Sequence, residues 1–464
     1  MSVFETTNTK IKTSPKKDST QKKISFVKAT KKKRKLIVKE KVSDLTVAET
    51  FVGCGGSHIA FKDNNFKTVF CNDIWKDSLD TLTENNPELD KKQVIHDDIK
   101  NLVNMDLLKM YNIKKGELSV LMGGVVCKGF SLAGVRNPFD DRNYLYISQL
   151  RLVEQLMPKV SVIENVPGMQ TMKILKKQGY GPISKKWGEI KVDETIDNLC
   201  KQLNDTIESM KQNRGKTIAI NKKLLENPSN SDELKKQHSD LTEEKNELTE
   251  IRDSYNKQLE KYKYGVLDDI VSRYEELGYR TEIKKLTCSD FGGYTKRQRL
   301  IIVAIRNDIK KEWQWPEITH SNNDDNLENL LTVRDAFDTL DLNDSNHPEN
   351  DPDNVPMNHK PSTVEKFKLV GKNKKKETFF SRGTSSRLSY DQPAPTLVPG
   401  HSSFQIHPEE HRSITVREGA TITGFPTNYK FSGNHSSRCM QIGNAIPYHL
   451  GNVIAKSVKK FLTD

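Results

Sequence analysis

Two short segments carry a cysteine and a carboxylate that could act on one substrate. Cys127 lies in the segment Leu121-Met-Gly-Gly-Val-Val-Cys-Lys-Gly-Phe-Ser131, whose glycines allow a ligand to approach the backbone closely. Glu164 follows the apolar run 160–163, which is typical of a buried strand. A nucleophilic sulfur with a nearby acid is suited to covalent attack on an electron-poor ring, followed by proton transfer.

A glycine-rich turn and two acids are candidates for binding a nucleotide. The turn Phe51-Val-Gly-Cys-Gly-Gly56 follows the predicted strand 46–51, and its glycines would let the backbone contact a cofactor. Asp73 follows the predicted strand 68–72, in the position of a carboxylate that binds ribose hydroxyls. Asp98 also follows a strand. The turn alone could equally serve NAD or simply reverse the chain, and each acid could be a helix cap.

Alternating strands and helices must position these residues. The runs 118–122 and 161–163 read as further buried strands, with a helix at 145–156 between them. Two more helices are predicted at 57–64 and 77–85. This alternation predicts the α/β class, with a mostly parallel, doubly wound sheet that binds ligands at the carboxyl ends of its strands.

Taken in order, and with Gln441-Ile-Gly-Asn-Ala-Ile-Pro447 near the C-terminus, these segments resemble the cytosine-5 DNA methyltransferases over residues 44–455. The resemblance implies a Rossmann-like lobe that uses S-adenosyl-L-methionine, a smaller target-recognition lobe, and double-stranded DNA as the partner. It also implies a cytosine flipped out of the duplex. Cys127 would add to carbon 6 while Glu164 stabilises the protonated N3 side. Carbon 5 would then take the methyl group and lose its proton as Cys127 leaves.

The resemblance assigns the remaining site residues. Arg297 and Arg299, in Tyr294-Thr-Lys-Arg-Gln-Arg299 before the predicted strand 300–305, would lie near the base and its phosphate. A cationic strand edge is the alternative. For the cofactor, the resemblance places Phe51 and Ile74 against the adenine, Asp73 at the ribose, Asp98 and Ile99 at the adenine edge, and Gly53, Gly56 and Asn444 at the methionine end.

Two departures from the family pattern flank the nucleophile. Val126 and Lys128 stand where the family usually has proline and glutamine. Valine does not fix the backbone angle φ as proline does, and the cation of Lys128 would lower the pKa of the thiol. We expect an active enzyme. The alternatives are methylation of cytosine in RNA, as in a tRNA-methylating branch, and a non-catalytic relative that only binds DNA.

The positive charge of the chain is concentrated at the N-terminus. The net charge is +12, and residues 1–43 are rich in lysine and poor in large apolar side chains. We expect a disordered basic arm that could track phosphates, direct nuclear import or have no specific task. No apolar run is long enough for a membrane helix. We expect an intracellular, DNA-associated protein, in the cytoplasm or nucleoid or in a eukaryotic nucleus, that is monomeric on DNA.

Residues 44–464 are expected to form one methyltransferase domain. Its large lobe would comprise 44–305 and 432–464, and its recognition lobe about 306–431. An insertion at about 172–263 has apolar residues at three- and four-residue steps on both sides of Asn227-Pro-Ser-Asn230, which predicts an antiparallel helical hairpin. We expect no metal, because the cysteines form no CxxC pair and Pro408 disfavours a helical site built on His407 and His411.

Overall fold

A seven-stranded sheet forms the centre of the part of the chain that the structure describes. The computed structural model describes residues 44–125, 141–175, 194–226, 231–340, 351–371, 386–397 and 404–464. Its main sheet has the strand order β3-β2-β1-β4-β5-β9-β8, and β6 and β7 form a second, small sheet. The strands are β1 (Thr46–Thr50), β2 (Lys67–Asp73), β3 (Val94–His96), β4 (Val120–Gly124), β5 (Val160–Asn165), β6 (Lys173–Leu175), β7 (Lys263–Gly265), β8 (Tyr279–Thr287) and β9 (Gln298–Arg306).

The sheet is mostly parallel, as predicted. Strands β1 to β5 pair in parallel, whereas β9 is antiparallel to both β5 and β8. The order reverses between β1 and β4, so the chain leaves these two neighbouring strands toward opposite sides of the sheet. In doubly wound folds, ligands bind at this switch point, beyond the carboxyl ends of the strands. The candidate nucleophile segment and the glycine-rich turn follow β4 and β1 respectively.

Successive residues of the central strands belong to two different cores. In β9, Ile302 packs in one cluster with Ile163 of β5, whereas Ile301 and Val303 pack in the other. Successive side chains of a strand point to opposite faces, so a sheet covered on both faces needs apolar residues at every position. This explains the continuous apolar runs from which the strands were predicted. Strand β8 was not predicted, because it is an edge strand with several half-buried or exposed polar positions.

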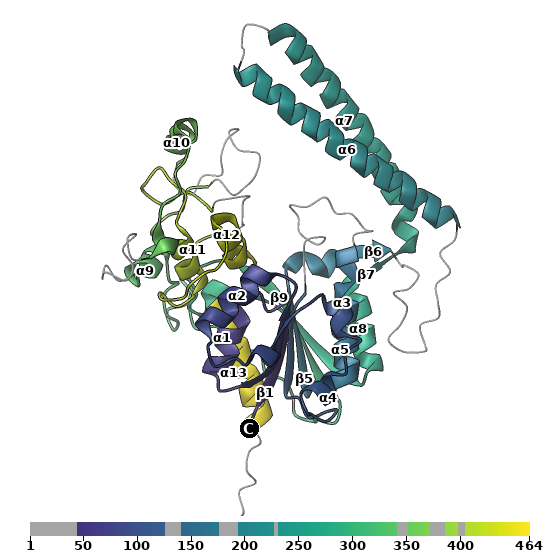
Figure 1. Cartoon of the computed structure of the whole chain (residues 1–464), viewed down its shortest axis with the longest axis vertical. Helices are drawn as coiled ribbons and strands as arrows, with labels where there is room; N and C mark the ends of the chain where they lie inside the picture. Colours follow the sequence, from purple (N-terminus) through teal and green to yellow (C-terminus); the bar gives the residue numbers. More distant parts are fainter. Residues whose placement is uncertain are drawn as a thin grey trace, which may run out of the picture. The chain divides into compact units, whose positions relative to one another are not determined.

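Helices cover both faces of this sheet (Figure 1). One core contains residues of α3, α4, α5 and α8, and the other contains residues of α1 and α13. No helix in the described ranges is long and apolar enough to cross a membrane. The helices are α1 (Gly56–Asp63), α2 (Lys76–Asn85), α3 (Ile99–Leu102), α4 (Leu107–Met110), α5 (Leu145–Leu156), α6 (Glu194–Glu226), α7 (Ser231–Leu259), α8 (Val266–Glu276), α9 (Val333–Asp338), α10 (Pro361–Lys368), α11 (Val416–Thr423), α12 (His435–Asn444) and α13 (Tyr448–Thr463).

Helices α6 and α7 lie side by side and run antiparallel (Figure 1). Asn213 Nδ2 of α6 donates a 2.9 Å hydrogen bond to the carbonyl oxygen of Leu241 in α7. Nearer the ends where the pair is joined to the rest of the chain, Leu203, Ile207 and Leu259 form a small apolar cluster. Ile251, which fits the helical pattern of the seam, is instead 44% exposed. The predicted turn 227–230 lies outside the described residues.

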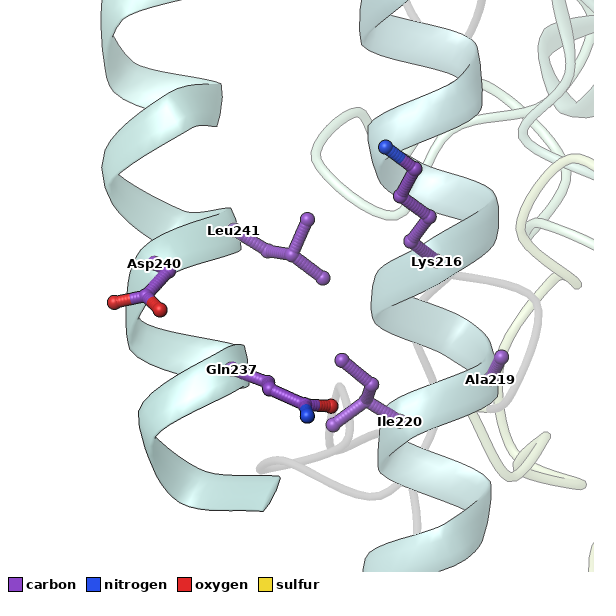
Figure 2. Close-up of a pocket in the computed structure, with 6 residues that line it drawn as sticks. All are labelled: Lys216, Ala219, Ile220, Gln237, Asp240 and Leu241. Atoms are coloured by element: carbon purple, nitrogen blue, oxygen red, sulfur yellow. The ribbon is translucent and has the colours of Figure 1, made fainter. Parts of the chain in front are cut away.

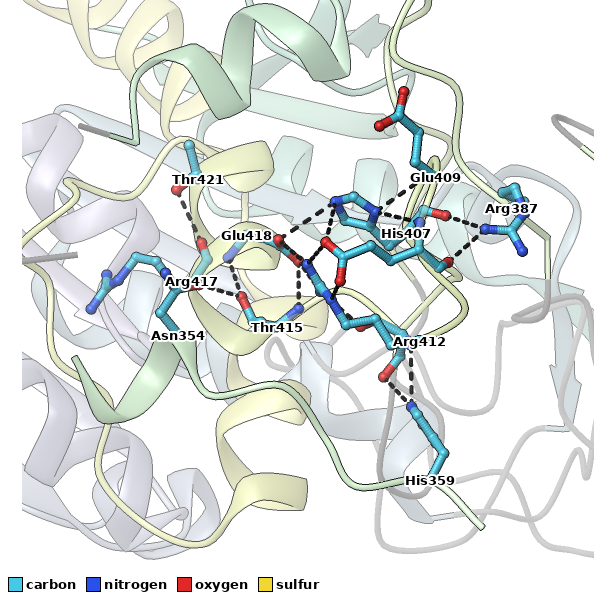
Figure 3. Close-up of polar contacts among 12 residues, drawn as sticks. Asn354, His359, Arg387, His407, Glu409, Arg412, Thr415, Arg417, Glu418 and Thr421 are labelled. Atoms are coloured by element: carbon cyan, nitrogen blue, oxygen red, sulfur yellow. Dashed lines mark hydrogen bonds and ion pairs between the residues drawn. The ribbon is translucent and has the colours of Figure 1, made fainter. Parts of the chain in front are cut away.

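A third core lies in the C-terminal part of the chain. It is built mainly from residues of 388–442, including Phe404 and Phe425, and it also takes in Ile59 of α1. Charged side chains within this part are paired with each other. Arg412 forms 2.8 Å hydrogen bonds with both carboxylate oxygens of Glu418, which also caps α11 together with Thr415 (Figure 3).

Candidate active site

The glycine-rich turn after β1 adopts a backbone that few residues tolerate. Phe51, Gly53 and Gly55 have φ angles of 52°, 57° and 100°. A non-glycine residue such as Phe51 rarely adopts positive φ, so the surrounding structure must hold it there. A Cβ atom on Gly53 would meet no atom of the described residues within 4 Å, whereas one on Gly56 would lie 2.5 Å from the carbonyl oxygen of Ile446. The turn is therefore open at Gly53 and closely packed at Gly56.

Asp73 at the end of β2 is held against this turn. Its Oδ2 accepts a 2.8 Å hydrogen bond from the backbone N–H of Gly53, and its Oδ1 accepts one of 2.9 Å from that of Trp75. Burial raises the pKa of Asp73, and the two backbone N–H groups oppose this effect. The structure thus brings Asp73 and Gly53 together.

The other predicted cofactor residues have different surroundings. Ile74 is 63% exposed, which is unusual for a large aliphatic side chain directly after a buried strand. Ile99 is buried in the core. Asp98 caps α3, because its Oδ1 accepts a 2.9 Å hydrogen bond from the N–H of Lys100. Asn444 is exposed at the end of α12, and the chain that follows it reaches the turn through the contact of Ile446 with Gly56.

The carboxyl ends of β1, β4 and β5 meet at Gly124. A Cβ atom on Gly124 would lie 3.5 Å from Glu164 Oε2 and 3.6 Å from the carbonyl oxygen of Phe51. The backbone after β4 is fixed by Asn165, whose Nδ2 donates a 3.0 Å hydrogen bond to the carbonyl oxygen of Val125. Cys127 itself lies outside the described residues. The chain that leads to it therefore starts beside the predicted acid and the glycine-rich turn.

Glu164 is paired with Arg299. The carboxylate Oε1 and the guanidinium Nε form an ion pair, and the two side chains are 12% and 8% exposed. Burial raises the pKa of Glu164, while the neighbouring guanidinium lowers it. A carboxyl group with these opposed influences can hold a proton more readily than an exposed one, which suits it to contact a ring nitrogen that gains a proton.

Arg297 lies just before β9 and is 4% exposed. Its Nη1 donates a 3.3 Å hydrogen bond to the carbonyl oxygen of Leu397. Its Nε is buried and has no hydrogen-bond partner among the described residues. Arg299 differs from the prediction in its place, because it lies within β9 rather than before it.

A buried polar cluster beneath the turn was missed by sequence reasoning. Glu49 Oε2 lies 2.8 Å from His58 Nδ1, and Glu49 Oε1 accepts a 2.7 Å hydrogen bond from Ser57. Cys71 Sγ lies 3.6 Å from His58 Nδ1. Three potential metal ligands thus converge within the described part of the chain. Glu49 ties β1 to the first turn of α1, and the only sequence signal was a polar residue inside an apolar strand.

His407 and His411 have separate partners. His407 Nδ1 accepts hydrogen bonds of 3.3 and 3.0 Å from the N–H groups of Glu409 and Glu410. His411 Nδ1 lies 3.2 Å from Nη2 of Arg387. Figure 3 shows His407 in the polar network around Arg412. The Nδ1 atoms of both histidines thus serve hydrogen bonds.

Comparison with known proteins identifies the family. The model described as C-5 cytosine-specific DNA methylase matches residues 45–178 and 256–460. The chain belongs to this family. The residues between the two matched ranges contain all of α6 and most of α7, so most of the hairpin lies outside the part that the C-5 methylase model describes.

Individual relatives are similar along most of the chain. The type II methyltransferase M.Eco47II of Escherichia coli is 25% identical over 444 residues, which cover 90% of this chain and 79% of that protein. M.BspRI of Lysinibacillus sphaericus is 25% identical over 448 residues, covering 91% and 78%. A solved E. coli structure, described as a DNA modification methyltransferase encoded within a prophage, has a TM-score of 0.56 at 19% identity and covers 90% of this chain and 100% of that one. This likeness confirms the Rossmann-like fold.

Proposed function

We propose that this C-5 methylase uses S-adenosyl-L-methionine to methylate carbon 5 of a cytosine flipped out of double-stranded DNA, through a covalent adduct with Cys127. The observation that carries the proposal is the meeting of three predicted site segments at Gly124. Glu164 and the carbonyl group of Phe51 both lie within contact distance of a Cβ atom on this glycine. Cys127 follows Val125 by two residues, which limits the distance between their Cα atoms to roughly 7 Å.

The glycine-rich turn fits the proposed cofactor. The side of Gly53 is open, and Asp73 is directed to the same turn. Each of the two Asp73 oxygens keeps lone pairs beyond its one backbone hydrogen bond, so the carboxylate can also accept from ribose hydroxyls. The exposed face of Ile74 offers apolar contact to an adenine ring. The proposed cofactor site is completed by Phe51, Asp98, Ile99, Gly56 and Asn444. The bound cofactor would supply an electrophilic methyl group.

The chemical steps follow from the residue types. The Cys127 thiolate would add to carbon 6 of cytosine, and Glu164 would stabilise the proton at N3 while electron density moves to carbon 5. Carbon 5 would then bond to the methyl carbon as the methyl–sulfur bond of the cofactor breaks, which leaves S-adenosyl-L-homocysteine. Loss of its proton to a base would restore the ring double bond and release the thiolate.

The two arginines have distinct proposed tasks. Arg299 would hold the Glu164 carboxylate in place through their ion pair. Arg297 has a buried Nε without a partner in the described ranges, which suits it to contact the base or its phosphate. A buried donor left unpaired costs free energy, so a bound ligand that accepts from it would be stabilised.

The type II methyltransferase relatives favour a role in modifying a specific DNA sequence, as in a restriction–modification system. Bisulfite sequencing of DNA from cells that express the chain tests activity and recognised sequence together. We expect protected cytosines at one recurring short sequence, absent with the Cys127→Ser variant. Unmodified DNA together with methylated tRNA would favour the RNA alternative, and no methylation of either would favour a non-catalytic relative.

A further inference from the structure

The inserted hairpin has a strongly uneven distribution of charge. Residues 209–225 of α6 contain no aspartate or glutamate, and their basic residues are Lys211, Arg214, Lys216, Lys222 and Lys223. The stretch 232–247 of α7 lies across the seam from this segment. It is acidic on balance, with Asp232, Glu233, Asp240, Glu243, Glu244 and Glu247 against Lys235, Lys236 and Lys245. Solvent-exposed helices that pack only against each other more commonly carry both acidic and basic residues along each helix.

The basic residues of this segment are exposed, although Lys216 also lines a groove between the two helices. Asn213 is 3% exposed and contacts α7 through the Leu241 carbonyl oxygen and Glu244. Arg214, Lys216 and Lys223 are exposed. In Figure 2, Ile220 and Leu241 both point into a shallow groove between the helices, while the Asp240 carboxylate points away from α6. The cationic groups of Arg214, Lys216 and Lys223 are therefore accessible to solvent, although α7 is acidic on balance.

The outer face of the same segment is unpacked. Ile218 is 60% exposed. A Cβ atom on Gly215 would meet nothing within 4 Å among the described residues. Glycine in the middle of a helix costs roughly 0.5–1 kcal/mol relative to alanine, and packing within the described chain does not account for it here. This face is available to a partner.

The hairpin is connected to the carboxyl end of β5, where the candidate active site lies. Strand β6 follows the 3₁₀ turn Pro167–Thr171, which itself follows β5 and Glu164. Lys211 lies seventeen residues into the chain from Glu194, the start of α6, which corresponds to about 25 Å of helix. Residues 209–225 thus lie far along α6 from its first residue. The segment that leads to α6 leaves the sheet at the carboxyl end of β5, where the candidate active site lies.

We propose that residues 209–225 of α6 bind the sugar–phosphate backbone of the DNA duplex beside the target base pair. The proposal rests on the proposed function, because it takes the substrate duplex as the partner. Lys211 is paired with Glu208 of the same helix, whereas Arg214, Lys216 and Lys223 are exposed. Exposed lysine and arginine match a polyanion, and such contacts increase affinity without reading sequence. The hairpin would lengthen the stretch of DNA that the enzyme contacts. It would do so beyond the two matched parts of the methylase domain.

The test compares two triple variants of the full chain. Arg214→Gln, Lys216→Gln and Lys223→Gln together remove three charges from the α6 segment. The matched control, Lys91→Gln, Lys92→Gln and Lys115→Gln, removes three exposed lysines that precede the amino ends of β3 and β4, whereas the candidate site lies at the carboxyl ends of the strands. The dissociation constant for a duplex with the target sequence is measured by fluorescence anisotropy at several salt concentrations, alongside thermal melting and S-adenosylmethionine binding.

Each lost phosphate contact should lower the salt slope by about 0.9. The α6 variant should therefore lose up to about 2.7 from its slope, so that its affinity deficit relative to wild type shrinks about 40-fold between about 50 and about 200 mM salt. The control variant should keep the wild-type slope. Equal slopes for wild type and the α6 variant would overturn the proposal, and a lowered melting temperature with an unchanged slope would show that these charges only stabilise the hairpin. A wild-type chain that methylates no DNA would contradict the proposed function instead.

Discussion

The carboxylate of Glu164 and the guanidinium of Arg299 form an ion pair at the carboxyl end of β5, where both side chains are largely withdrawn from water. The two residues come from neighbouring antiparallel strands, β5 and β9. This pairing couples the predicted acid to the predicted basic segment. Its consequence is that the proton affinity of Glu164 depends on a residue far away in the sequence.

Replacing Arg299 should change the pH dependence of methyl transfer. The guanidinium lowers the pKa of Glu164, so Arg299→Ala should raise that pKa and move the limb of the rate profile governed by Glu164 to higher pH. The rate should also fall, by about 100-fold or more if general acid–base catalysis is impaired. Single-turnover rates between pH 5 and 10 provide the measurement. Arg280→Ala, which removes a half-buried arginine bonded to the carbonyl oxygens of Ile309 and Lys311, serves as the control. An unshifted pH profile in Arg299→Ala would show that the Glu164–Arg299 ion pair does not control the pH dependence of catalysis.

Replacing Asp73 should weaken the binding of the cofactor. Asp73→Ala removes the proposed ribose contact and the acceptor for the Gly53 N–H, and we expect a loss of about 1–3 kcal/mol in S-adenosylmethionine binding. Asp73→Asn, which keeps one acceptor oxygen, should lose less. Isothermal titration calorimetry measures both, with Asp106→Ala, the cap of α4, as a control. Wild-type affinity in Asp73→Ala would rule out this ribose assignment.

Acid should destabilise the protein partly through His449. Burial lowers the pKa of His449 to about 4, whereas an unfolded histidine titrates near about 6.5. The folded state therefore disfavours the proton, so this stability is present above about pH 6.5 and is lost as the pH falls toward about 4. His449→Phe should reduce the loss of unfolding free energy between these pH values by about 1–3 kcal/mol. Urea denaturation at both pH values measures it. His359 and His407, whose pKa values burial also lowers, should contribute to the remaining acid sensitivity. An equal loss in wild type and variant would contradict this role of His449.

Local patterns predicted the parts of the site that lie on one segment. The glycine-rich turn, Asp73 and Glu164 were found because each follows an apolar strand, and helix 145–156 has the bounds of α5. Contacts between distant segments were not predictable in this way. The convergence of Glu49, His58 and Cys71 depends on strand pairing and on the position of α1. The carbonyl partner of Arg297 comes from Leu397, a hundred residues later, and nothing in either segment signals it.

Removing the hairpin should leave a folded methylase. Leu175 of β6 pairs with Lys263 of β7 in an antiparallel ladder, so the two ends of the insertion are adjacent and a short Gly/Ser linker can replace residues 176–262. The apolar cluster of Leu203, Ile207 and Leu259 is lost as a unit and leaves no cavity in the two cores of the sheet. We expect cofactor binding and methylation to survive, with weaker DNA affinity. Thermal melting with and without S-adenosylmethionine checks this expectation. A variant that no longer folds would mean that the hairpin supports the core of the large lobe.

The covalent role of Cys127 is the central claim, and trapping with a 5-fluorocytosine duplex tests it most directly. Fluorine at carbon 5 cannot leave as a proton does, so the adduct should persist after methyl transfer. We predict that the wild-type chain, incubated with this duplex and S-adenosylmethionine, gives a protein–DNA species that survives denaturing electrophoresis, and that peptide mass spectrometry locates the link at Cys127. Cys127→Ser should bind the duplex without forming it. A wild-type chain that methylates ordinary duplex but forms no adduct, or a link at another residue, would contradict the account.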